Sequence, residues 1–224
     1  MSWGLPIDWE LPIGETFYTR FKRKGELFTM TEPDYSKIKD HLRSKRRCVD
    51  IGAHIGTTVA RYAYHFEKVY AFEPMHMKIC KKNVGHLENV EFYPVALSDR
   101  TGTVDMVMAD GNSGASSVQD VSNKETLNRS VLRFNQKNKI SVESKTLDSY
   151  QFKEIDFIKM DTEGYVLPVL EGMRNTIIDN EYPILQIEFN GLCPNKEECL
   201  EWLDNLGYKL YDTYHVDHFF KVIT

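Results

Sequence analysis

Two pairs of oxygen-bearing side chains follow hydrophobic runs in the second half of the sequence. Asp161 and Glu163 come after IDFIKM, and Glu188 and Asn190 close PILQIEFN. The members of each pair are two residues apart, so in an extended chain they point to the same side. If the two runs are neighbouring strands of an open α/β sheet, the four groups converge where such sheets place their sites.

Two kinds of chemistry fit such a cluster. A carboxylate could remove a proton as a general base, or the oxygens could hold Mg²⁺ or Ca²⁺. We favour the metal-free route, because no third acid is closely spaced, and we therefore expect no metal. Lys159 lies two residues before Asp161 and could pair with it or reach a substrate. The predicted catalytic residues are Lys159, Asp161, Glu163 and Glu188, with Asp161 the most important; the alternative is that the acids cap helices.

A glycine-rich turn spans Asp50 to Gly56, with the sequence DIGAHIG. Glycine permits a tight strand-to-helix turn and lets the backbone approach a ligand closely. The pattern is D-x-G-x-x-x-G, not the G-x-G-x-x-G of pyrophosphate binders, so it suits a ligand without a pyrophosphate, such as S-adenosylmethionine (SAM). Asp50 could receive the ligand's ammonium group. The alternative is a turn that binds nothing.

Glu73 lies 23 positions after Asp50, close to the usual spacing of an acid that binds ribose hydroxyls. The alternative is an acid that caps the helix expected from Pro74. Ser98 and Asp99 follow the next expected strand and are predicted to lie near an adenine. The predicted cofactor-binding residues are Asp50, Gly52, Ala53, His54, Gly56, Glu73, Pro74, Ser98 and Asp99.

Alternating strand and helix patterns position these residues. Strands are expected at 48–52, 68–73 and 90–97, with helices between them, and this order implies a parallel sheet. Strands at 103–109 and 140–147 flank a polar segment, 110–138, which we expect to be a mobile lid. A strand at 155–161, a helix over 166–177, a strand at 183–190 and a helix over 196–206 follow. The helix ends at Gly207, and 208–215 with 216–223 form a hairpin.

These elements predict a class I methyltransferase Rossmann-like α/β fold, whose seven-stranded, mostly parallel sheet ends in a C-terminal antiparallel hairpin. We expect an N-terminal arm with a short helix at Tyr35–Leu42 over residues 1–45, and a SAM-dependent methyltransferase domain over 46–224.

Composition narrows the class of protein. The chain has 28 Lys and Arg against 33 Asp and Glu, a net charge of −5, which gives no general attraction to nucleic acid. No apolar run reaches the roughly 18 residues of a membrane span, and no signal peptide is evident.

The cysteines at 48, 80, 193 and 199 form no C-x-x-C pair, so we expect reduced thiols in a cytoplasmic protein. Nothing in the composition indicates an oligomeric state.

Several motifs resemble the FkbM family of methyltransferases. They are VDIGAHIG, YAFEP, NVGHLENV, ALSD, TLDSY and DFIKMDTEGYVLPVLEG, in order over about residues 48–190. The resemblance implies SAM as cofactor and, most often, O-methylation of hydroxyls on small molecules or carbohydrates. It places Lys159, Asp161, Glu163 and Gly164 in a K-x-D-x-E-G signature. The chain departs from the family at His54, usually Asn, and at Val166, often Glu.

Three other functions remain open. A nicotinamide-dependent oxidoreductase would share the fold type. The glycine spacing of G-x-G-x-x-G is missing here, however, and the terminal hairpin also argues against this function. A SAM-binding module without turnover is the non-enzymatic alternative. Nucleic-acid methylation is the third alternative. The sequence has no N/D-P-P-Y/F motif for it, and its net negative charge is unfavourable.

Overall fold

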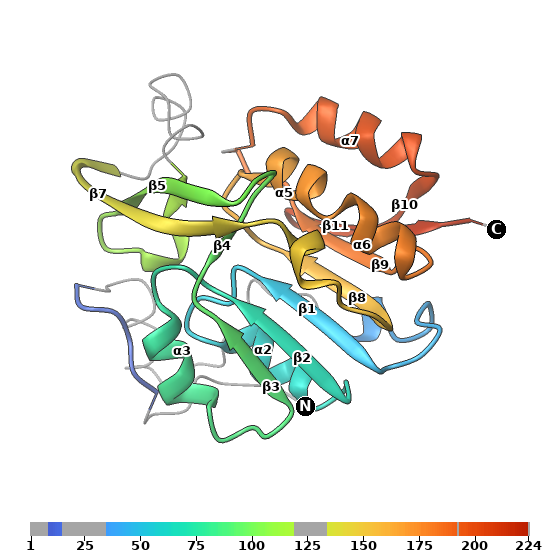
Figure 1. Ribbon diagram of the computed structural model, residues 1–224, viewed down its shortest axis with the longest axis horizontal. Helices are drawn as coiled ribbons and strands as arrows, with labels where there is room; N and C mark the ends of the chain where they lie inside the picture. Colours follow the sequence, from blue (N-terminus) through green and yellow to red (C-terminus); the bar gives the residue numbers. More distant parts are fainter. Residues whose placement is uncertain (1–8, 15–34, 119–133, 192, 224) are drawn as a thin grey trace.

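A seven-stranded sheet forms the centre of the protein (Figure 1). The computed structural model describes residues 9–14, 35–118, 134–191 and 193–223. In the sheet, the strand order is β10-β11-β9-β8-β1-β2-β3. The strands are β1 (Arg47–Ile51), β2 (Lys68–Phe72), β3 (Val90–Tyr93), β8 (Ile155–Met160), β9 (Ile184–Glu188), β10 (Tyr208–Tyr214) and β11 (Asp217–Val222).

Strand direction confirms the predicted fold. β1 pairs in parallel with β2 and β8, and β8 pairs in parallel with β9. β11 runs antiparallel to both β9 and β10, which closes the sheet with a hairpin. The carboxyl ends of β1, β2, β8 and β9 therefore lie along one edge, the edge where such sheets bind ligands.

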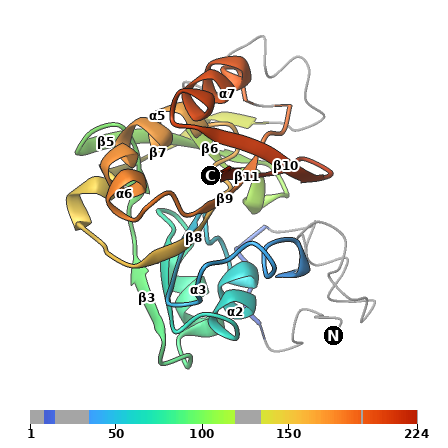
Figure 2. The same cartoon turned by 90° about the vertical axis from the view of Figure 1, so that its right-hand side faces the viewer.

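Helices cover both faces of this sheet (Figure 2). Helices α2 (Thr57–Ala63) and α3 (Met77–Val84) pack on one face. Helices α5 (Val166–Gly172), α6 (Arg174–Asp179) and α7 (Lys196–Asn205) pack on the other. In β1, Cys48 packs in the core on the side of α2 and α3, whereas Val49 and Ile51 pack in the core on the side of α5, α6 and α7. Successive side chains of a strand point to opposite faces of the sheet in this way.

One predicted helix is two in the structure. The apolar pattern over 166–177 predicted a single helix, but α5 ends at Gly172 and α6 begins at Arg174. Met173, between them, has φ −119° and lies outside helical geometry. A Cβ on Gly172 would lie 1.9 Å from the carbonyl oxygen of Ser98, so this close approach requires glycine. Helix α7, in contrast, stops where predicted, before Gly207 at φ +85°.

The predicted strand 90–97 is also divided. Pro94 has no N–H and cannot continue a ladder on both sides, so β3 ends at Tyr93 and the chain enters another sheet. This second sheet has the order β4-β7-β5-β6 and contains β4 (Ala96–Leu97), β5 (Gly102–Ala109), β6 (Ser117–Val118) and β7 (Phe134–Lys145). The strands predicted at 103–109 and 140–147 are thus present, but in a sheet of their own.

The predicted lid, 110–138, lies partly outside the described residues, which omit 119–133. Its described part contains a 3₁₀ turn, η2 (Ser113–Ala115), followed by β6, and residues 134–138 already belong to strand β7. The predicted helix at Tyr35–Leu42 is a shorter 3₁₀ turn, η1 (Tyr35–Lys37). A further 3₁₀ turn, η3 (Leu147–Tyr150), leads from β7 to β8.

No helix among the described residues combines the length and hydrophobicity needed to cross a membrane.

Candidate functional site

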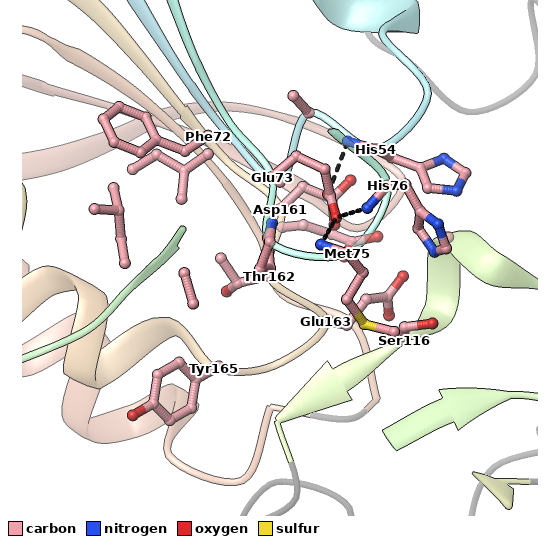
Figure 3. Close-up of a pocket in the computed structure, with 18 of the residues that line it drawn as sticks. His54, Phe72, Glu73, Met75, His76, Ser116, Asp161, Thr162, Glu163 and Tyr165 are labelled. Carbon is pink, nitrogen blue, oxygen red and sulfur yellow. Dashed lines mark hydrogen bonds between the residues drawn. The ribbon is translucent and has the colours of Figure 1, made fainter. Parts of the chain in front are cut away.

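A pocket opens at the carboxyl ends of the parallel strands, between the main sheet and the second sheet (Figure 3). Most of the predicted site residues line it. They are Gly52, Ala53, His54, Glu73, Pro74, Lys159, Asp161, Glu163 and Glu188. The structure therefore brings the predicted cofactor residues and the predicted catalytic residues into one cavity.

Gly52 owes its identity to a backbone contact. Its φ is +87°, and a Cβ would lie 1.8 Å from the carbonyl oxygen of Asp161. The loop after β1 therefore presses against the loop after β8, and glycine is needed for that contact rather than for space at a ligand. Gly56 is not part of the pocket wall; at φ +98° its absent Cβ leaves room for Val84 of α3.

Asp50 lies behind the pocket instead of in its wall. The residue is fully buried, and its register partner on β8 is Lys159. The ammonium of Lys159 lies 3.8 Å from Asp50 Oδ1 and 3.3 Å from Asp161 Oδ2. Burial raises the pKa of Asp50, and the nearby Lys159 ammonium and Thr58 hydroxyl oppose the rise. Lys159 thus pairs with Asp161, one of the two roles predicted for it, and links the two carboxylates.

Glu73 holds the loops after β1 and β2 together. Its Oε1 accepts the backbone N–H groups of Met75 at 2.7 Å and His76 at 2.8 Å, and its Oε2 accepts that of His54 at 3.0 Å (Figure 3). The capping alternative is therefore present in the structure, just before α3. Glu73 also lines the pocket. Its Oε2 accepts only one of these three bonds, so this oxygen can accept a further hydrogen bond from a ligand.

The carboxylates of Asp161, Glu163 and Glu188 converge. One oxygen from each lies within 4.8 Å of those of the other two. Asn190 Nδ2 donates to Glu163 Oε2 at 2.7 Å and to Glu188 Oε2 at 3.0 Å. The predicted meeting of the two pairs at adjacent strand ends therefore occurs, although Asn190 itself holds the acids from behind and is not in the pocket wall.

Crowding among these acids changes their protonation. Burial, followed by the charge of Asp161, raises the pKa of Glu163 to about 8. Burial and the charges of Asp161 and Glu163 raise the pKa of Glu188 to about 11. Both shifts favour the protonated form, in which a carboxyl group can donate a hydrogen bond, while Asp161 lies beside the Lys159 ammonium.

A fourth carboxylate, Asp217, was missed by sequence reasoning. It opens β11 opposite Glu188 of β9 and lines the pocket. Gln186 Nε2 donates to Asp217 Oδ1 at 2.8 Å, and the Tyr62 hydroxyl donates to Gln186 Oε1 at 2.9 Å. The signal for this acid lay in the pairing of the hairpin with β9, which no local motif reveals.

Ser98 and Asp99 are absent from the pocket wall. Ser98 is buried, and its Oγ lies 2.9 Å from both Asp99 Oδ1 and the Tyr165 hydroxyl. The preceding apolar residues 95–97 line the pocket in their place, together with Phe72. The chain turns into the second sheet after Pro94, and this turn carries 98–99 past the cavity.

His54 has a backbone conformation unusual for a residue other than glycine, with φ +47°. Desolvation, followed by the influence of His76 and Lys159, lowers the pKa of His54 to about 3. Its ring is therefore neutral, and Nε2 lies 2.8 Å from Ser113 Oγ of η2. His54 thus connects the loop after β1 to the second sheet.

The fold and the site together define a class I methyltransferase architecture. The family model of the methyltransferase FkbM domain matches residues 50–210, and the chain belongs to that family. The match includes all the pocket-lining residues except Asp217 of β11.

Two known proteins show how far the similarity extends. The 2-O-methyltransferase NoeI of Sinorhizobium fredii is 28% identical over 148 residues, 60% of this chain and 60% of that protein. The crystal structure of Methyltransferase FkbM from Methylobacillus flagellatus superposes with a TM-score of 0.53 at 18% identity, covering 83% of this chain and 46% of that one. The matched region thus spans less than two thirds of either relative, and the solved structure supports the fold alone.

Proposed function

We propose that this protein transfers the methyl group of SAM to a hydroxyl oxygen of a small molecule or carbohydrate. One observation carries the proposal: the glycine loop and Glu73 share a single pocket with the carboxylates of Asp161, Glu163 and Glu188. Membership of the FkbM family supports methyl transfer, and the similarity to a 2-O-methyltransferase supports an oxygen acceptor.

The pocket residues fit SAM in chemical type. The apolar wall of Phe72 and residues 95–97 suits a purine ring, and the remaining acceptor capacity of Glu73 suits a ribose diol. Thr162 lines this pocket. Its Oγ1 is buried and has no hydrogen-bond partner within the described part of the chain. A polar ligand would satisfy that group. When bound, SAM supplies an electrophilic methyl group.

Asp161 is the residue that we assign as general base. An alcohol is a poor nucleophile at neutral pH, so its proton must leave as the new bond forms, and a positioned base accelerates this by about 10²–10⁴-fold. Lys159 holds the Asp161 carboxylate from 3.3 Å. The protonated Glu163 and Glu188 would donate hydrogen bonds to acceptor oxygens and would not compete for the proton.

A divalent cation is the alternative use of the same three carboxylates. We favour the metal-free route, because the Lys159 ammonium already supplies a positive charge next to Asp161. A chelator separates the two routes once an acceptor is known. We expect turnover to be unaffected by EDTA; loss of turnover that added Mg²⁺ restores would assign the cluster to a metal.

The acceptor class is tested by screening hydroxylated compounds. Purified protein is incubated with SAM and a panel of sugars, oligosaccharides and phenols, and release of S-adenosylhomocysteine (SAH) is measured. We expect release with at least one hydroxylated compound and none with nucleic acid, since the net charge of −5 opposes a polyanion. Release with RNA or DNA alone would replace the proposed acceptor class.

A further inference from the structure

The segment 112–118, with the sequence NSGASSV, forms one wall of the pocket. We call it the serine clasp. Asn112, Ser113, Gly114, Ser116 and Val118 of this segment line the cavity from the side of the second sheet. The clasp therefore lines the same cavity as Glu73 and the acid cluster.

Two serine hydroxyls attach the clasp to the main sheet. Ser113 Oγ lies 2.8 Å from His54 Nε2 in the loop after β1. Ser117 Oγ donates to the backbone carbonyl of Glu163, at 2.9 Å, in the loop after β8. The clasp is thus bound to both loops that carry the predicted chemistry.

Both attachment points have strained backbone. His54 has φ +47° and Glu163 has φ +50°, conformations that cost a residue with a Cβ about 1 kcal/mol or more. Such conformations persist where the surroundings over-determine them, and they cluster at ligand clamps. At His54 the surroundings include the bond from its own N–H to Glu73 Oε2.

A chain of hydrogen bonds therefore runs from the cofactor residue Glu73 through His54 to Ser113 of the clasp. The His54 ring is neutral, so it contributes one donor and one acceptor nitrogen and is a poor proton acceptor. This argues against His54 as a base and for a role in holding the clasp.

We propose that His54 and Ser113 are positioning residues that couple the cofactor loop to the serine clasp, so that a ligand bound beside Glu73 also orders the acceptor side of the pocket. The proposal rests on the proposed function, because SAM is the ligand that would bind there. It assigns a function to part of the polar segment 110–138, for which the sequence predicted only a lid.

Hydrogen exchange of the full chain, with and without SAH, tests this coupling. In the parent protein, SAH should slow exchange of amides in both 52–56 and 112–118. Ser113→Ala should keep the effect of SAH at 52–56 but lose about 2- to 10-fold of the protection in the clasp, the net worth of one hydrogen bond.

Two substitutions of His54 form a matched pair. Asparagine tolerates positive φ but its amide is too short to replace Nε2, whereas the glutamine amide reaches about that position. His54→Asn should therefore behave like Ser113→Ala, and His54→Gln should retain clasp protection. A merely structural role for His54 would not give this difference between the two amides.

The outcomes separate the coupling from the function. If calorimetry shows that SAH does not bind the folded parent, the proposed function fails and the coupling fails with it. If SAH binds but leaves the clasp unprotected, or protects it equally in Ser113→Ala, only the coupling is wrong.

Discussion

At the scale of single residues, three neighbouring carboxyl groups of the pocket lie in environments that affect their protonation differently. Asp161 lies 3.3 Å from the Lys159 ammonium, whereas burial and the neighbouring carboxylates raise the pKa values of Glu163 and Glu188. Carboxyl groups of one chemical type thus differ in protonation because their environments differ, and we propose that this difference separates a base from two hydrogen-bond donors.

Replacing Asp161 tests the assignment of the base. Asp161→Asn keeps the shape of the side chain but removes its charge, so we expect turnover to fall by about 10²–10⁴-fold. The affinity for SAH, measured by calorimetry, should stay within a few-fold. Normal turnover in this variant would make Asp161 structural and place the base elsewhere.

The raised pKa values predict how stability depends on pH. A carboxyl whose folded pKa lies above its unfolded value binds more protons when folded, so its contribution is most favourable below about pH 4.5 and is lost as the pH rises through the folded value. The ligand-free protein should therefore lose stability as the pH rises above about 5, because Glu163 and Glu188 ionise in the unfolded chain while the folded protein keeps their protons. The loss due to Glu163 should end near pH 8, and the loss due to Glu188 should continue to near pH 11.

Glu188→Gln removes one of these groups without changing its size. At pH 9 we expect this variant to unfold at a higher temperature than the parent, because its amide needs no proton in the folded protein. The difference should be about 2–4 °C for each kcal/mol gained in the free energy of unfolding. At pH 4 the two proteins should unfold alike. Glu201→Gln, at an exposed position on α7, serves as control and should change neither value. A parent as stable as Glu188→Gln at pH 9 would contradict the assigned protonation.

At the scale of elements, the site depends on how closely the loops after β1 and β8 approach each other. Gly52 marks that approach, because its Cβ would overlap the Asp161 carbonyl. The glycine at position 52 therefore fixes the position of the Asp161 backbone as well as that of the loop after β1.

Gly52→Ala should destabilise the protein by more than about 2 kcal/mol, since it adds both a positive-φ cost and a backbone clash. The control is Gly191→Ala, where nothing lies within 4 Å of an added Cβ, with an expected change within about 0.5 kcal/mol. Thermal or urea unfolding measures both. Equal stability of the two variants would show that the loops are not in contact as described.

Local patterns predicted most of the main sheet and much of the pocket. Hydrophobic runs ending in Gly52, Glu73 and Asp161 identify parallel strands whose carboxyl ends share an edge, and strand spacing brings Glu188 to the same place. The departures have physical causes. Pro94 diverts the chain into a second sheet, which moves Ser98 away from the pocket, and Asp217 reaches the site only through the pairing of β11 with β9.

At the scale of the whole molecule, the second sheet distinguishes this protein from a bare seven-stranded fold. It covers the carboxyl edge of the main sheet, and the serine clasp within it completes the pocket. The main sheet thus provides the predicted cofactor-binding residues and the acid residues, and the second sheet provides another wall of the same pocket. Differences in acceptor among related proteins are expected to reside in that wall, because loops and insertions vary more than the scaffold that carries them.

Calorimetry with SAH measures whether this pocket binds SAM. We predict micromolar binding to the parent protein, no binding of NAD, and a loss of about 1–3 kcal/mol of affinity in Glu73→Ala, the cost of losing hydrogen bonds to a charged group. Glu73→Gln, which preserves side-chain size, should lie between the two because it keeps one carbonyl acceptor. Folded parent protein that binds NAD and not SAH, or a Glu73→Ala variant that binds SAH as the parent does, would contradict the account.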